Sequence, residues 1–406
     1  MLFDTGLLEI GLMFVSIALG GAIASRINQA EIPIYIIFGM VMGPYVAGEY
    51  GFFYVGQQSE VSHFVEMGAE IGVIFLLFFL GLEFNMQRIF ENRDRIGKAG
   101  FLDLLNLIFG LLLGYILLRD VLGALLIGGI VYISSSAVIT KSLIDMGWIV
   151  NDESEPILGI LVFEDLFIAL YIAFISSLLL ETGGIGDLVL QMGLSVGFIV
   201  VLIGLVYFGT RIFDRVADAT SDEMLILRIF AVTVFVAGLA LAAGVSEAVA
   251  AFFIGMAFSD TQYEEDIEKL LEPVRYVFGS IFFFWIGMVT DPSLFKGILP
   301  LVLVFVVFTS LSKFLTGYSG GKIYDLDTRR STRVGMGMIA RGEFSLIIAS
   351  LAAISGGVYA TEIVTETVPA FAVVYVLIMS ILGTSLMYYS GYFERAVKRI
   401  VGESRV

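Results

Sequence analysis

The chain has 406 residues, of which 58% are hydrophobic and only 15% are charged, and none is cysteine. A soluble protein usually has about 25% charged residues, so this composition indicates a membrane protein. The formal net charge of −16 argues against nucleic acid as a partner. The lack of cysteine excludes a disulfide framework and a thiolate metal site. We expect the lipid bilayer as the main partner, and no cofactor.

Apolar stretches long enough to cross a bilayer recur along the chain, which predicts an all-α membrane protein with 13 transmembrane helices. The first stretch lacks the basic start of a signal peptide and is too long for one, so we interpret it as a span. The predicted spans are residues 6–25, 32–50, 66–86, 100–118, 121–145, 156–180, 187–209, 223–243, 244–260, 273–290, 297–318, 333–356 and 367–390.

The Lys and Arg residues outside these spans predict the orientation of the chain. Only Arg119 and Lys296 fall on one side of the predicted membrane, and all the others fall on the opposite side. By the positive-inside rule, the N-terminus lies outside and the C-terminus lies in the cytoplasm of a cell-membrane protein. Acidic runs at 151–155 and 264–272 are expected in solvated loops. The amphipathic segment 390–401 is expected at the cytoplasmic interface.

Glycines in corresponding spans predict an internal repeat. The pairs separated by 207 residues are Gly48 with Gly255, Gly72 with Gly279, and Gly128 with Gly335. Because this offset covers seven predicted helices, the second copy has the inverted topology in the membrane. Inverted repeats are frequent in secondary transporters.

Spans 121–145 and 333–356 hold the same place in the two repeats, and polar residues interrupt both. The polar residues are Ser134, Ser135, Ser136 and Thr140 in the first span, and Arg341 and Glu343 in the second. An unwound helix at membrane depth presents carbonyl groups and dipole ends to a cavity, which favours two broken helices. Two alternatives stay open. The serines can serve close helix packing, and the two charged residues can pair or only satisfy the ends of half-helices.

Glu164 and Asp165 lie near the middle of the apolar run 157–180. A charge at that depth costs several kcal/mol, so the pair is a candidate site where a metal cation and a proton compete. Lys313 also lies within a span and needs a counter-charge, for which Glu164 or Asp165 is available. Asp103 falls near a predicted helix end, from which its carboxylate is expected to extend to the interface.

Seven short segments, spread along the chain, follow one another in an order that can be compared with known families. They are FLGLEFN, SSSAVITKSL, ILVFEDL, SEAVAAFFIGM, FFFWIGM, the Lys313 span and ARGEFSLII. In this order the chain resembles the monovalent cation:proton antiporter-2 family over nearly its whole length. The resemblance implies a homodimer, in which a core domain with two crossing broken helices moves as an elevator against a dimerisation domain.

The resemblance also assigns roles to residues. Asp165 matches the ion- and proton-binding aspartate of the family, and Lys313 matches the lysine that pairs with the preceding carboxylate in sodium-type members. That preceding position is Glu164 here, whereas it is typically Asp in sodium-type members and Gln in potassium efflux members. The choice between sodium and potassium therefore stays open. The segments around Thr140 and Glu343 match the crossing helices.

On this basis we divide the chain into five parts. Residues 1–96 and 221–295 are the halves of the dimerisation domain, residues 97–182 and 296–406 are the halves of the core with a C-terminal interfacial segment, and residues 183–220 are a linker helix.

We expect a secondary active antiporter that exchanges sodium or potassium for protons and supports pH homeostasis. The alternatives are a channel or sensor on the same scaffold and a proton-coupled solute symporter. An enzyme is not expected, because the sequence has no catalytic triad, metal-ligand cluster or nucleotide loop. Some members of the resembled family use a separate cytoplasmic regulatory subunit, so such a subunit is a further candidate partner.

Overall fold

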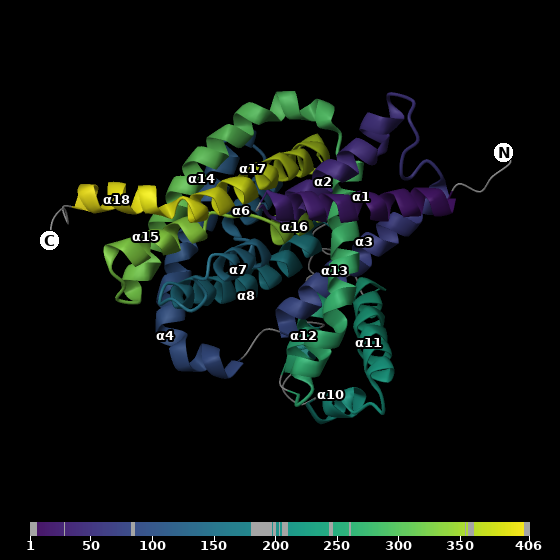
Figure 1. Cartoon of the computed structure of the whole chain (residues 1–406), viewed down its shortest axis with the longest axis horizontal. Helices are drawn as coiled ribbons and strands as arrows, with labels where there is room; N and C mark the ends of the chain where they lie inside the picture. Colours follow the sequence, from purple (N-terminus) through teal and green to yellow (C-terminus); the bar gives the residue numbers. More distant parts are fainter. Residues whose placement is uncertain are drawn as a thin grey trace.

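The computed structural model describes residues 6–27, 29–82, 86–179, 200–202, 210–242, 247–259, 261–353 and 361–401, with Gly197, Gly204 and Ser355. These residues form helices joined by short connections, and they include no β-strand (Figure 1). Nine of their helices are long and apolar enough to cross a membrane. The all-helical membrane class is therefore confirmed. The count of 13 stays a prediction, because most of predicted span 187–209 lies outside the described residues.

Contacts divide most of these helices into two groups. In the first group, α3 packs along α12 and α13, α13 packs along α2, and α1 and α11 lie outside them. This group consists of α1 (Gly6–Arg26), α2 (Glu31–Met42), α3 (Ser59–Leu82), α11 (Asp222–Ala242), α12 (Glu247–Ser259) and α13 (Glu264–Val289).

The second group surrounds the two interrupted helices. In it, α14 packs against α15, α17 and α4, while α8 contacts α4 and both interrupted helices. Its members are α4 (Met86–Asp103), α5 (Leu105–Leu118), α6 (Val121–Tyr132), α7 (Ser136–Asp145), α8 (Ser154–Leu179), α14 (Phe295–Ile323), α15 (Thr328–Gly337), α16 (Glu343–Ala353), α17 (Val368–Tyr388) and α18 (Ser390–Val401).

Helix boundaries repeat along the chain. The starts of α6 and α15, at Val121 and Thr328, are 207 residues apart, and the starts of α7 and α16 have the same separation. Packing repeats as well. A Cβ on Gly110 would lie 2.4 Å from Val131, and a Cβ on Gly317 would lie 2.9 Å from Gly335 and 3.2 Å from Met338. Since Gly110 and Val131 correspond to Gly317 and Met338 at this offset, the internal repeat is a structural repeat.

One of the predicted glycine pairs does not fit this repeat. Gly48 ends the short helix η1 (Pro44–Gly48) and lies beside the ring of Tyr54. Gly255 instead packs against the backbone of α3, where a Cβ would lie 1.9 Å from the carbonyl oxygen of Phe78. The two glycines therefore have unlike surroundings. Their separation matched the repeat by coincidence, because glycine is abundant in this chain.

The acidic runs are more ordered than predicted. Residues 264–272 form the first turns of α13 instead of a loop. Glu153 is only 1% exposed and accepts from Arg333, which also contacts Glu394 of α18 at 2.7 Å. These ion pairs hold α18, predicted as an amphipathic helix, against α15. Glu153 is buried because Arg330 and Arg333 both pair with it, whereas Glu265, Asp266 and Glu268 of α13 stay exposed as predicted.

Gly81→Ala tests the close contact between α3 and α12. Its Cβ would lie 1.9 Å from the carbonyl oxygen of Phe252, so the helices must separate, at a cost of about 1–3 kcal/mol. We expect a lower thermal unfolding temperature in detergent. Gly238→Ala on α11 is the matched control, because nothing lies within 4 Å of its Cβ and alanine favours the helix by about 0.5–1 kcal/mol. Equal unfolding temperatures for the two variants would contradict the packing.

Candidate functional site

Both predicted broken helices are interrupted at the centre of the second group. The first break separates α6 from α7 at residues 133–135, and the second separates α15 from α16 at residues 338–342. The two breaks contact each other. The backbone N–H of Ser135 donates to the carbonyl oxygen of Ala340 at 3.0 Å, and the Ser134 hydroxyl donates to that of Met338 at 3.1 Å. Each break thus supplies partners for the other.

Arg341 and Glu343 compensate the helix ends created by the breaks. The fully buried Arg341 guanidinium donates to the carbonyl oxygens of residues 338, 339 and 340 and to that of Val131 on α6. Glu343 is the first residue of α16, and its carboxylate accepts from the Ser135 hydroxyl at 2.6 Å. A cation at carbonyl ends and an anion at an N-terminus match the helix dipoles. This geometry favours the structural interpretation of both charges.

Gly342 permits the crossing. A Cβ at this position would lie 2.3 Å from the hydroxyl oxygen of Ser135, which also caps α7 by accepting from the N–H of Val138. Any larger residue would therefore displace either the cap or the second break.

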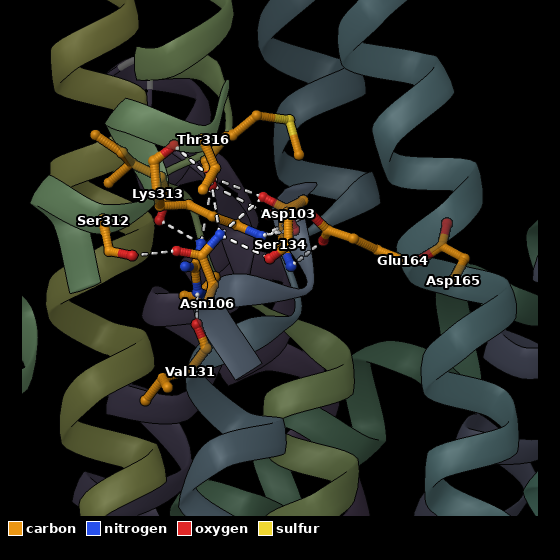
Figure 2. Close-up of polar contacts among 12 residues, drawn as sticks. Asp103, Asn106, Val131, Ser134, Glu164, Asp165, Ser312, Lys313 and Thr316 are labelled. Carbon is orange, nitrogen blue, oxygen red and sulfur yellow. Dashed lines mark hydrogen bonds and ion pairs between the residues drawn. The ribbon is translucent and has the colours of Figure 1, made fainter. Parts of the chain in front are cut away.

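Lys313 lies between two carboxylates beside the first break (Figure 2). Its Nζ is 2.7 Å from Oε1 of Glu164 and 2.5 Å from Oδ2 of Asp103, and all three side chains are completely buried. The ring of Tyr132 lies 5.0 Å from the same nitrogen. Glu164 also accepts from the backbone N–H of Ser134 at 2.6 Å. The predicted pairing of Lys313 with Glu164 is therefore present in the structure.

Asp103 was predicted wrongly as a residue that extends to the interface. The span that contains it begins near Arg93, not at residue 100, so Asp103 lies well inside the span at the junction of α4 and α5. It is 0% exposed. A signal was present in the sequence, because Asn106 follows one helical turn later and corresponds to Lys313 at the 207-residue offset.

Asp165 has different partners from Glu164, although the two residues are adjacent on α8. Its carboxylate accepts from the Ser136 hydroxyl, at 2.8 and 3.1 Å, and it is 5% exposed. Figure 2 shows Glu164 reaching toward Lys313 and Ser134, with Asp165 apart from that cluster. Thr140 is half-buried on α7, four residues after Ser136 and hence on the same helix face.

This arrangement offers oxygen atoms to a small cation beside Asp165. Carboxylate and hydroxyl oxygens suit hard cations, and the N-terminus of α7 adds a positive dipole end that favours the ionised carboxylate. Within the described part of the chain, no cluster of three or more His, Cys, Asp or Glu side chains is arranged to hold a metal ion.

Comparisons with known proteins agree on one kind of protein. The sequence model of a family described as "Sodium/hydrogen exchanger, transmembrane" matches residues 14–388. The K(+)/H(+) antiporter subunit KhtU of Bacillus subtilis is 34% identical over 396 residues, which cover 97% of this chain and 95% of the relative. The ammonium/H(+) antiporter subunit AmhT of Alkalihalophilus pseudofirmus is 28% identical over 416 residues, with coverage of 98% and 99%.

A solved structure has the same fold. The sodium proton antiporter MjNhaP1 from Methanocaldococcus jannaschii, determined at pH 8, superposes with a TM-score of 0.72 over 96% of this chain and 99% of its own. Its sequence is only 16% identical, so the likeness concerns the fold alone.

Removing Lys313 tests the buried ion pairs. We expect Lys313→Ala to reduce the free energy of unfolding in detergent by about 3–5 kcal/mol, because it leaves buried carboxylates without a counter-charge. Double-mutant cycles with Glu164→Gln and with Asp103→Asn measure the two couplings. Lys141→Ala is the control, since Lys141 pairs with Glu31 at a partly exposed position and should cost about 0–1 kcal/mol. Strict additivity in both cycles would exclude the pairs.

Proposed function

The chain belongs to the sodium/hydrogen exchanger family of membrane cation:proton antiporters, and on this premise we propose that it exchanges sodium or potassium for protons at Asp165. The observation that carries the assignment is the position of Asp165. It is a nearly buried carboxylate on α8, and it accepts from the hydroxyl of Ser136 at the N-terminus of α7. Such a carboxylate can bind either a proton or a cation, and the two ligands therefore compete for it.

The competition at Asp165 produces the exchange. When the site faces one side, a cation that binds the carboxylate displaces its proton to water. When the site faces the other side, a proton displaces the cation. An empty and ionised carboxylate opposes movement through the low-dielectric interior, so the core moves mainly with one of the two ligands bound. Ser136, which already contacts both carboxylate oxygens, is placed to add a hydroxyl ligand.

The identity of the cation is the finer part of the proposal. KhtU is named for potassium and AmhT for ammonium, and MjNhaP1 is named for sodium. The 34% identity to a relative named for potassium makes potassium the first cation to test. The carboxylate at Glu164 departs from the glutamine that the resemblance associates with potassium efflux members, so sodium stays in the proposal.

The two helix groups support an elevator mechanism. Helices α1–α3 and α11–α13 would form the dimerisation domain of a homodimer, and the group around α14 would form the moving core. Of the divisions proposed at residues 96, 182, 220 and 295, the first falls inside α4, which packs with the core group. We place the N-terminus outside and the C-terminus in the cytoplasm of the cell membrane. KhtU and AmhT are both named as antiporter subunits, which supports a separate subunit as a partner here.

Asp165→Asn tests the carrier group. Asparagine keeps the size of the side chain but cannot exchange a proton for a cation, so we expect cation-driven proton flux in proteoliposomes to fall to the level of empty liposomes. The thermal unfolding temperature should stay close to that of the wild type. Asp94→Asn is the control, because Asp94 is 87% exposed and should leave flux unchanged. Wild-type flux in Asp165→Asn would overturn the assignment.

A panel of cations tests the function itself. Proteoliposomes that all start with the same pH gradient receive potassium, sodium, lithium or ammonium in turn. The change of internal pH is then recorded over time. We expect proton flux with potassium or sodium that is lost in Asp165→Asn. No proton flux with any of the four cations would contradict the antiporter proposal. Cation flux without proton flux would favour the channel alternative.

A further inference from the structure

The two helix groups face each other across an interface with few polar contacts. Ile32, in the first turn of α2, is 7% exposed, and its Cδ1 lies 3.6 Å from where a Cβ on Gly342 would stand in the second break. Farther along, a cavity of about 60 Å³ separates α3, α12 and α13 from Ile347, Ser350 and Leu351 of α16. The charged side chains that line this cavity are three carboxylates of the first group, so no ion pair between described residues crosses it.

One ion pair does join the two groups. Glu31 is the first residue of α2, and its Oε1 accepts a hydrogen bond from Nζ of Lys141 on α7. Of the ion pairs and hydrogen bonds that join two described residues, it is the one that connects a helix of the first group with a helix of the second. Lys141 belongs to the segment SSSAVITKSL, yet the proposed transport site does not use it. We call this contact the interdomain pair.

The interdomain pair can break and form again at little cost. The side chains of Lys141 and Glu31 are 44% and 34% exposed, so water solvates both charges when they separate. An exposed pair of this kind shifts an equilibrium by about two- to fivefold. By contrast, Lys313 and its carboxylates are completely buried, and breaking such a pair is strongly unfavourable. A contact that breaks in every transport cycle therefore has to be of the exposed kind.

Movement of the core along the first group must break this contact. Apolar side chains such as Ile32 can slide along a neighbouring surface, because new dispersion contacts replace those that are lost. An ion pair instead needs two particular atoms within about 4 Å of each other, so it separates when α7 moves relative to α2. The same movement carries Gly342 away from Ile32, which then becomes exposed.

We propose that the interdomain pair holds the moving core against the dimerisation domain in the conformation of this structure, and that it is broken when the transport site faces the other side. The proposal rests on the proposed function and specifies a contact that its elevator movement must break. Glu31 and Lys141 are positioning residues, because neither binds the cation or the exchanged proton. By the predicted orientation, the pair lies on the cytoplasmic side, where α2 begins.

Cross-linking tests movement across this contact. The chain has no cysteine, so Glu31→Cys combined with Lys141→Cys gives a variant with these two thiols alone. A short reagent with two thiosulfonate groups joins the thiols in proteoliposomes, and a reductant later cleaves the link. We expect cation-driven proton flux to fall to the level of empty liposomes after cross-linking and to return after reduction. Unchanged flux in the cross-linked variant would overturn the proposal.

A cross-link inside the core is the matched control. Arg95 of α4 and Asp325, which follows α14, also form an exposed ion pair, with 3.0 Å between Nη2 and Oδ2. Both residues lie within the second group, so Arg95→Cys combined with Asp325→Cys should retain its flux after the same treatment. Equal losses of flux in the two cross-linked variants would contradict a specific role of the interdomain pair.

Thiol labelling tests the pair itself. A cysteine placed by Ile32→Cys is covered while the pair is formed, so its rate of reaction with N-ethylmaleimide follows the population in which the core has moved away. We expect Lys141→Ala and Glu31→Gln each to raise this rate about two- to fivefold. Together they should raise it no further than either does alone, since both remove the same interaction. Unchanged rates or additive effects would overturn the proposal.

Met40→Cys is the control for labelling. Met40 is also 7% exposed, but it lies where α2 packs along α13 within the first group, with its backbone nitrogen 2.9 Å from where a Cβ on Gly287 would stand. Its labelling rate should be the same with and without Lys141→Ala. An equal rise at both positions would indicate a general loosening of α2 and would overturn the proposal.

The proposed function and this inference fail in different ways. Absence of exchange with all four cations in the wild type contradicts the proposed function. Exchange that persists in the cross-linked Glu31→Cys, Lys141→Cys variant contradicts the interdomain pair and leaves the exchange activity in place.

Discussion

The structure depends on the need to satisfy backbone groups where two helices unwind inside a membrane. Lipid offers no hydrogen bonds, and each unpaired N–H or carbonyl group there costs several kcal/mol. The breaks at 133–135 and 338–342 meet this need by contacting each other, through the N–H of Ser135 and the hydroxyl of Ser134. Arg341 and Glu343 then place charges at the helix ends that the breaks create.

The proposed transport site follows from this crossing. The start of α7 at the first break brings Ser136 to Asp165, and the preceding turn of the chain brings the N–H of Ser134 to Glu164. The N–H of Ser134 is available to Glu164 because the helix is interrupted at this point. In a continuous helix the same N–H would donate to a backbone carbonyl oxygen of the preceding turn.

Much of this arrangement could be predicted from the sequence. Polar residues within apolar spans marked both breaks, and the cost of a lone buried charge predicted a carboxylate partner for Lys313, either Glu164 or Asp165. The resemblance then favoured Glu164. Asp103 was missed because its importance depends on where its span begins. A run of charged residues before residue 100 concealed the start of the membrane span at Arg93, so a central residue was taken for a terminal one. The separate partners of Glu164 and Asp165 could not be predicted from the sequence either. Adjacent side chains on a helix point about 100° apart, and the packing of the neighbouring helices decides which group each side chain contacts.

The repeat explains how a nearly symmetric scaffold acquires a polar centre. Asn106 and Lys313 hold equivalent places in the two copies, yet one is a neutral amide and the other an ammonium, and both reach Asp103. The same offset pairs Ser134 with Arg341 and Ser136 with Glu343 at the two breaks. In all three pairs the charged side chain belongs to the second copy and the neutral one to the first. The two copies are therefore alike in their backbone but not in their charges.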